Sequence, residues 1–328
     1  GRGGVGREAF QEIDYRAVYG TMVKWATEID QVDRIPEVLS RAWALATSGR
    51  PGPVVIALPE DMLRDMTDVT PLTGPARIAE PAADYATMRD ALDILSKAKR
   101  PLILIGGCNW SPVGQAALKD FAEKSDIPVV AAFRYQDMID NHSPVFCGEA
   151  GVGMPPHVRR LITEADTILA INTRFGESTT DGYTLLDVPH PKQRLIHVHG
   201  SPLEIAKVYQ PELGLVAGPN AFVSGLTPVS GEWAEWRSQA RADYESSQHA
   251  PAQPSPVDMG RVVAYLQKRL PDDAVITNGA GNFAIWSGKF FRFGADQRLL
   301  APQSGAMGYG LPAALAAKAP DAARFVLC

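Results

Sequence analysis

PLILIGGCNWSPVGQAALKDFAEKSDIPVVAA, residues 101–132, contains a complete strand–helix–strand pattern. The apolar run Leu102–Ile105 predicts a buried strand, and the two glycines after it allow a sharp turn. Ser111 and Pro112 predict the capped start of a helix. Pro128–Ala132 predicts the next strand. Strands joined through a helix are typical of a parallel sheet, so this stretch predicts an α/β fold.

The alternation of predicted helices and strands extends from this stretch toward both ends of the chain. Further helices are predicted at residues 34–48, 88–98, 156–164, 203–208, 229–250 and 256–270. Further strands are predicted at residues 54–58, 167–172, 194–199, 213–217 and 274–277. Residues 67–85 and 250–256 are aperiodic and rich in Pro, Ala or Thr, which predicts two linkers. We therefore expect three parts, namely residues 1–70, a parallel-sheet domain at 86–226, and residues 256–328.

The composition is that of an ordinary globular protein, with 328 residues of which 45% are hydrophobic and 21% charged. A net charge of −5 argues against nucleic acid or an anionic membrane as the main partner. No apolar run approaches the roughly 18 residues that would span a bilayer. Three widely spaced cysteines form neither a disulfide framework nor a zinc motif, so we expect a cytoplasmic location.

A glycine-rich run near the end of the chain is the strongest candidate for a ligand-binding segment. Residues 305–310 hold three glycines, and Pro312 follows where a helix should begin. Glycines let a backbone approach a ligand closely, and the free N–H groups of a helix start suit an anion or a polar heterocycle. A packing turn between a strand and a helix explains these residues equally well.

A second glycine cluster, Thr277–Ala284, follows a predicted strand and opens a helix. Its spacing formally matches the dinucleotide fingerprint G-x-G-x-x-A. The acidic residue expected about 20 positions further on is not convincingly placed, because Asp296 lies too near. A phosphate-contacting loop is therefore preferred to a nicotinamide site, and a turn that binds nothing remains the alternative.

Three further segments carry weaker signals. Phe10 and Gln11 lie in a Gly-flanked region, where a helix start with a buried Phe is the simpler interpretation. Arg174 follows the strand at 167–172, where it would either clamp a phosphate or form a surface ion pair. His197 and His199 should share one face of a strand, but no nearby residue completes a metal site, which favours a structural role.

Taken in order, these segments resemble the thiamine-diphosphate-dependent enzymes of the acetolactate synthase type. The matching runs are AFQE at 9–12, SGRPGPVVIALPED at 48–61, the Gly106-Gly107 strand end, TRFGE at 173–177, IHVHGSPLEI at 196–205, TNGAGNFAIW at 277–286 and GAMGYGLPAALAAK at 305–318. The resemblance implies that the three parts are the end of a pyrimidine-binding domain, a whole Rossmann-like central domain and the start of a diphosphate-binding domain.

The resemblance also implies a function, which is decarboxylation of a 2-ketoacid such as pyruvate followed by carboligation, in the biosynthesis of branched-chain amino acids. A 2-ketoacid or oxalyl-type decarboxylase of the same family is the first alternative. A non-catalytic nucleotide-binding module is the alternative of another class. A nicotinamide dehydrogenase would rest on the glycine spacing at 279–284 alone.

Site residues are implied by the same resemblance. Met307 would be the apolar wedge under thiamine diphosphate, and Phe10 and Gln11 would line the active site from a partner subunit of a homodimer or homotetramer. The residues implied to contact the cofactor's pyrimidine and diphosphate are Gly305, Ala306, Ala280, Gly281, Asn282 and Phe283. The residues that would contact FAD, used by some members of the family, are Arg50, Gly106, Gly107 and Arg174.

The chain departs from the family pattern in ways that bear on these expectations. Ser178 and Glu60 stand where the family has Arg and Lys, which weakens both FAD binding and a strict acetolactate assignment. No metal ligand is assigned here, because the family's Mg²⁺-binding segment should follow Cys328 and its activating glutamate should precede Gly1. We therefore expect that the chain is truncated at both ends and inactive alone.

Overall fold

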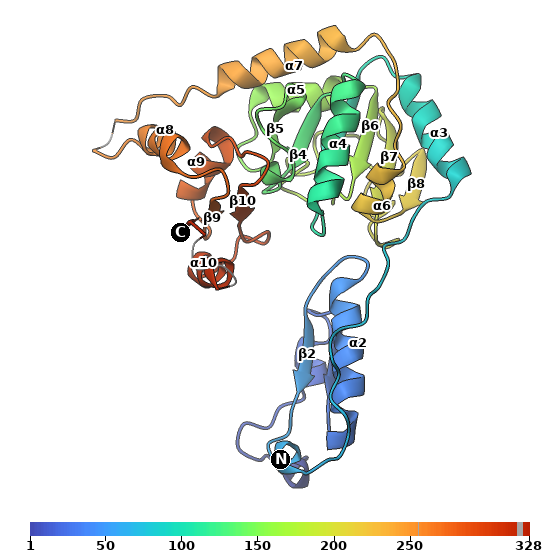
Figure 1. The fold of residues 1–328 in the computed structure, drawn as a ribbon, viewed down its shortest axis with the longest axis vertical. Helices are drawn as coiled ribbons and strands as arrows, with labels where there is room; N and C mark the ends of the chain where they lie inside the picture. The colour runs from blue at the N-terminus through green and yellow to red at the C-terminus, as the bar shows by residue number, and fades with distance from the viewer. Residues whose placement is uncertain (255, 320–323) are drawn as a thin grey trace. The chain divides into compact units, whose positions relative to one another are not determined.

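The structure is a computed structural model that describes residues 1–254, 256–319 and 324–328 (Figure 1). It divides into two compact units, Gly1–Glu80 and Pro81–Cys328. The prediction of three parts, 1–70, 86–226 and 256–328, stays a prediction, and its last part includes residues 320–323, which lie outside the described residues.

The first unit is built on two parallel strands and one long helix. Strand β1 pairs in parallel with β2, and helix α2 connects them. The core is formed by Ile29, Val38 and Met62, all under a tenth exposed. The elements of this unit are three short 3-10 helices at Arg2–Gly4, Val32–Arg34 and Met62–Arg64, with α1 Tyr15–Tyr19, β1 Trp25–Glu28, α2 Ile35–Thr47 and β2 Val54–Ala57.

The second unit contains a six-stranded, fully parallel sheet in the order β5-β4-β3-β6-β7-β8. Its strands are β3 Pro101–Ile105, β4 Val129–Ala132, β5 Phe146–Ala150, β6 Thr167–Ile171, β7 Arg194–His199 and β8 Leu213–Val216. A 3-10 helix at Gln136–Met138 follows β4. The predicted α/β class with a parallel sheet is confirmed.

Helices cover both faces of this sheet, which gives three layers (Figure 1). Alternate residues of β3 face opposite ways, so Ile103 packs with α3, α4 and α6 and Leu102 packs with α5 and α7. The helices are α3 Tyr85–Ser96, α4 Pro112–Lys124, α5 Pro156–Glu164, α6 Pro219–Ser224 and α7 Ala234–Ser247. Ser111 caps α4 as predicted, because its hydroxyl accepts the Gly114 N–H at 3.0 Å.

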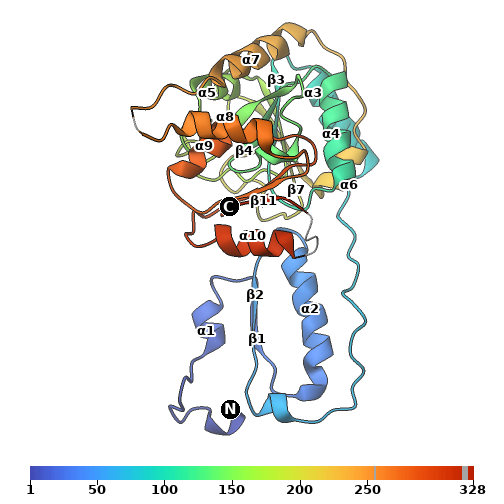
Figure 2. The same cartoon turned by 60° about the vertical axis from the view of Figure 1, so that its left-hand side comes forward.

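A smaller parallel sheet, β10-β9-β11, follows in the same unit (Figure 2). Its apolar core joins Val263 of α8 to Ile276 of β9, Leu299 of β10 and two phenylalanines, Phe291 and Phe293. The elements are α8 Met259–Arg269, β9 Val275–Thr277, α9 Phe283–Phe290, β10 Arg298–Leu300, α10 Gly310–Lys318 and β11 Val326–Leu327. No helix among the described residues of the chain is both long and apolar enough to cross a membrane.

Two sequence-based predictions differ from the structure. The helix predicted at 203–208 is a series of turns. Ala206 adopts a φ of 58° there, which no right-handed helix accommodates. The helix predicted at 229–250 is the shorter α7, of which only Ala240 and Tyr244 are buried. Trp233, just before it, is buried as well and donates its Nε1–H to Ala98 O at 2.9 Å.

Candidate functional site

The structure brings the two glycine-rich segments together at the smaller sheet. Thr277, at the end of β9, donates its hydroxyl proton to Gly310 O at 3.0 Å. A side chain at Gly310 would lie 3.0 Å from the Asn278 carbonyl carbon and 3.1 Å from Gly279 N. The start of α10 therefore packs directly on the loop after β9, and only a glycine allows that approach.

The loop before α10 is open to solvent. Gly305 and Gly308 have φ values of 71° and 83°, and no atom lies within 4 Å of a Cβ built at either position. Ala306 is exposed between them, and Met307 is 87% exposed. The positive φ at these two positions favours glycine, whereas no neighbouring atom requires it. The space beside the backbone is therefore open to a ligand.

The loop after β9 offers a matching surface. Asn278 is buried, and its side-chain oxygen has no hydrogen-bond partner among the described residues. A buried amide atom without a partner is costly, and a bound polar group would satisfy it. Residues 279–282 are partly or fully exposed, and Phe283 begins α9 with the N–H groups of its first turn.

These two loops fit the polar ends of thiamine diphosphate. The predicted residues Ala280, Gly281, Asn282 and Phe283 lie in the first loop, and Gly305, Ala306 and Met307 lie in the second. Open backbone beside a helix start suits a diphosphate. An exposed thioether next to left-handed glycines suits an aromatic heterocycle.

Phe10 and Gln11 belong to the first unit. Glu12 organises their loop, because its carboxylate accepts N–H groups of Gly6 at 2.5 Å and Ala9 at 2.9 Å. Those bonds lower the pKa of Glu12. Phe10 at the tip is 94% exposed. The alternative of a helix start with a buried Phe is therefore wrong for this chain.

Close packing explains two of the four residues implied for FAD, the glycines. A side chain at Gly106 would lie 3.1 Å from Ala132 Cβ, and at Gly107 it would lie 2.5 Å from Asn172 O. Arg174 forms an ion pair with Glu204 at 3.6 Å, beside a cavity of about 90 Å³. Arg50 is exposed in the first unit. FAD binding by these residues stays a prediction.

The two histidines of β7 are structural. His197 Nε2 lies 2.9 Å from Thr173 O, and burial lowers the pKa of His197 to about 4, so its ring is neutral. His199 Nδ1 accepts the Ser201 N–H at 3.0 Å. The described residues contain no group of three His, Cys, Asp or Glu side chains arranged to hold a metal ion.

Two carboxyl groups beside β4 and β5, those of the buried Asp137 and the half-buried Glu149, were not predicted from the sequence. Burial raises the pKa of Glu149 to about 7 and that of Asp137 to about 6. Glu149 accepts the Arg134 N–H at 2.5 Å, and Asp137 accepts the Leu299 N–H at 3.0 Å. No spacing signal marks them, because β5 itself, with Gly and Glu in its sequence, lacks the apolar run that predicts a buried strand.

Glu149→Gln should change the pH dependence of stability. The folded pKa of about 7 lies above the ordinary 4.5, so the wild-type protein loses stability as pH rises from about 4.5 through 7. The variant lacks this loss and should be more stable than wild type by about 2 kcal/mol at pH 8 and nearly equal at pH 5. Urea denaturation at both values measures it.

Glu212→Gln is the control with the opposite sign. Arg194 lowers the pKa of Glu212 through a paired hydrogen bond, so this variant should be the less stable protein at pH 8. A Glu149→Gln variant that is destabilised at pH 8 would contradict the assignment.

Comparisons with known proteins identify proteins to which most of this chain is similar. Residues 88–226 match the family model described as "Thiamine pyrophosphate enzyme, central domain". Residues 88–226, which include the six-stranded sheet, are therefore similar to the central domain of thiamine-diphosphate-dependent enzymes.

Within that class, nearly the whole chain is similar to acetolactate synthase large subunits. It is 28% identical to the isozyme 1 large subunit of Escherichia coli K12, with 99% of this chain and 58% of that protein aligned. It is 26% identical to the large subunit of Parasynechococcus marenigrum WH8102 (100% and 54%) and 28% identical to that of Corynebacterium glutamicum (98% and 53%). The chain thus spans a little over half the length of these relatives, and the resemblance seen in the sequence is confirmed.

Proposed function

We propose that the protein carrying this chain is a thiamine-diphosphate-dependent enzyme that acts on 2-ketoacids in the manner of an acetolactate synthase. The observation that carries the proposal is the contact between the two open glycine loops, held by Thr277 and Gly310. The similarity to acetolactate synthase large subunits along 99% of the chain supports it. When bound, the cofactor's thiazolium would supply the electron sink for loss of carbon dioxide.

The chain's own residues would bind and orient this cofactor. The backbone N–H groups of Ala280, Gly281, Asn282 and Phe283 would hold the diphosphate. Asn278 Oδ1 is an acceptor, so the partner that it lacks would be a donor such as an N–H group of the cofactor. The backbone at Gly305 and Ala306 would meet the aminopyrimidine, and Met307 would pack under the cofactor and exclude water. Phe10 and Gln11 would contact substrate from a second subunit.

Several finer features belong to the same proposal. Mg²⁺ would accompany the diphosphate, the enzyme would be a homodimer or homotetramer, and it would work in the cytoplasm in branched-chain amino acid biosynthesis. FAD binding by Arg50, Gly106, Gly107 and Arg174 would be an addition, visible as a flavin absorption band in the purified full-length gene product.

Met307→Ala tests the site in that full-length protein. Because the side chain is 87% exposed here, its loss should leave stability within about 0.5 kcal/mol of wild type. Thiamine diphosphate affinity in Mg²⁺ buffer should nevertheless fall at least about tenfold, as lost burial of an apolar side chain predicts. Calorimetry measures the affinity, and product analysis with pyruvate separates acetolactate synthesis from simple decarboxylation.

Leu203→Ala is the matched control, since Leu203 is also apolar and 81% exposed but belongs to the turns after β7 and to neither loop. It should change neither stability nor affinity. Equal affinity in wild type and Met307→Ala would remove Met307 from the site. No binding by wild type would favour the non-catalytic nucleotide-binding module.

A further inference from the structure

A short segment after β4 is bonded to the smaller sheet, more than 150 residues further along the chain. Asp137 Oδ2 accepts the N–H of Leu299, in β10, at 3.0 Å across a separation of 162 residues. Asn141 makes two bonds with Phe293, donating its N–H to Phe293 O at 2.8 Å and accepting the Phe293 N–H on Oδ1 at 3.0 Å. Asp137 and Asn141 are both at least 97% buried.

Arg134 reaches the base of the Gly305 loop itself. Its guanidinium donates to Pro302 O, and Gln303 Nε2 donates to Arg134 O at 3.3 Å. Pro302 O also accepts the Gly305 N–H at 3.0 Å, which closes the turn that sets the φ of Gly305. Arg134 of the central domain is therefore bonded to Pro302 O, the same carbonyl oxygen that closes the turn at Gly305.

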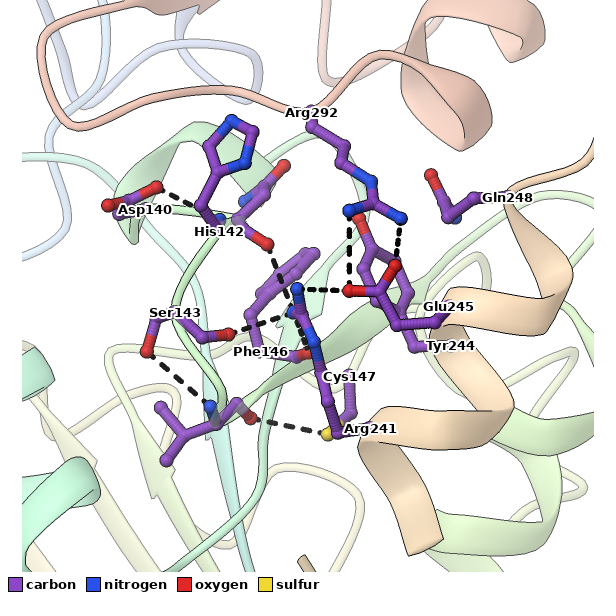
Figure 3. Close-up of polar contacts among 12 residues, drawn as sticks. Asp140, His142, Ser143, Phe146, Cys147, Arg241, Tyr244, Glu245, Gln248 and Arg292 are labelled. Carbon is purple, nitrogen blue, oxygen red and sulfur yellow. Dashed lines mark hydrogen bonds and ion pairs between the residues drawn. The ribbon is translucent and has the colours of Figure 1, made fainter. Parts of the chain in front are cut away.

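The segment that carries these contacts is itself fixed. Asn141 Nδ2 donates to Gln136 O at 2.7 Å and Ile139 O at 2.9 Å. Arg241 of α7 donates to the carbonyl oxygens of Asn141, Ser143 and Phe146, and Glu245 links Arg241 to Arg292 (Figure 3). A fixed segment can impose its geometry on the loop that it contacts.

Two buried polar atoms of the segment lower the stability of the fold. Asp137 Oδ1 and Gln136 Oε1 are buried without a partner among the described residues. Each such atom destabilises the fold, and apolar side chains would fill the same space at lower cost. Packing alone does not explain a carboxylate here, whereas its bond to Leu299 does.

We propose that Arg134 and Asp137 are positioning residues for the Gly305 loop, so that the central domain sets the shape of the cofactor site. Arg134 fixes the turn at Pro302, and Asp137 fixes the strand that leads into it. The proposal rests on the proposed function for its consequence, which is that thiamine diphosphate affinity depends on two side chains that do not touch the cofactor.

The test uses Arg134→Met and Asp137→Ala in the full-length gene product, with two readouts. Hydrogen exchange of amides 299–308, measured without cofactor, should rise about tenfold in either variant, the effect of one lost bond to a charged group. Thiamine diphosphate affinity, by calorimetry in Mg²⁺ buffer, should fall about tenfold.

Conservative variants separate positioning from general damage. Lys at 134 can still donate to Pro302 O, and Asn at 137 can still accept from Leu299, so Arg134→Lys and Asp137→Asn should return both readouts to within about threefold of wild type. Arg194→Met is the control. Arg194 in β7 pairs with Glu212, so this variant should alter neither readout.

Unchanged exchange at 299–308 in Arg134→Met would overturn the proposal, as would a rise of the same size in Arg194→Met. Raised exchange with unchanged affinity would overturn it too, since the loop would then move without consequence for binding. If wild type bound no thiamine diphosphate but the exchange pattern held, the positioning role would stand and the proposed function would fall.

Discussion

Gly107→Ala is expected to destabilise the central domain by at least about 3 kcal/mol. Gly107 has a φ of 69°, and its new Cβ would lie 2.5 Å from the backbone oxygen of Asn172. Asn172 is held in place by two hydrogen bonds, from its N–H to Val198 O at 2.7 Å and from its Nδ2–H to Cys108 O at 2.8 Å. The clash must therefore distort the edge of the sheet where β3 and β6 end.

Gly182→Ala separates the clash from the backbone conformation. Gly182 has nearly the same φ, 68°, but no atom lies within 4 Å of its added Cβ. The Gly182→Ala variant should lose about 1 kcal/mol of unfolding free energy, which is the effect of the positive φ without a clash. Guanidinium denaturation followed by circular dichroism gives both values. Similar losses for the two variants would show that packing does not demand glycine at 107.

Arg241→Met should cost about 3 kcal/mol. Its Nη1 donates to three carbonyl oxygens at 2.8 to 3.0 Å, those of Asn141, Ser143 and Phe146, and its Nη2 pairs with Glu245 at 2.5 Å. Only 13% of this side chain is exposed, so water cannot replace the lost donors. Met keeps the apolar stem of Arg, which isolates the polar loss.

Arg237→Met, one turn earlier on α7, is the comparison. Arg237 is nearly as buried, at 22% exposed, but it bonds to a single side chain, that of Asp126, at 3.0 Å. Its loss should cost about 1 kcal/mol. Chemical denaturation of both variants measures the difference. Equal losses would mean that the three carbonyl bonds contribute nothing beyond an ordinary ion pair.

The fold of the central domain was largely predictable because its signals are local. The apolar run at 102–105 and the cap at Ser111 each specify an element from neighbouring residues, and the structure confirms both. Strand β5 was missed because Gly148 and Glu149 interrupt its apolar pattern. Its place in the sheet depends on pairing with β4, a contact between distant residues that no window of sequence contains.

In the candidate site, too, features with a local sequence signal were predictable and features that depend on contacts between distant residues were not. Glycines mark both cofactor loops in the sequence, so their positions were predicted, although their cofactor contacts stay a prediction. Their contact through Thr277 and Gly310 follows from the order of strands in the smaller sheet. The attachment of the second loop to Arg134 and Asp137 had no sequence signal, because single Arg and Asp residues after a strand are ordinary surface residues in most proteins.

Strand β5 lies at the border of the six-stranded sheet, and α9 lies against it, since a side chain at Gly288 would come 3.3 Å from Glu149 Oε2. Border strands offer unpaired backbone groups that can recruit a second molecule and seed aggregation. Helix α9 therefore covers part of this border strand. A central domain expressed without residues 256–328 would lose that cover, and we expect it to be less soluble even though its own core is complete.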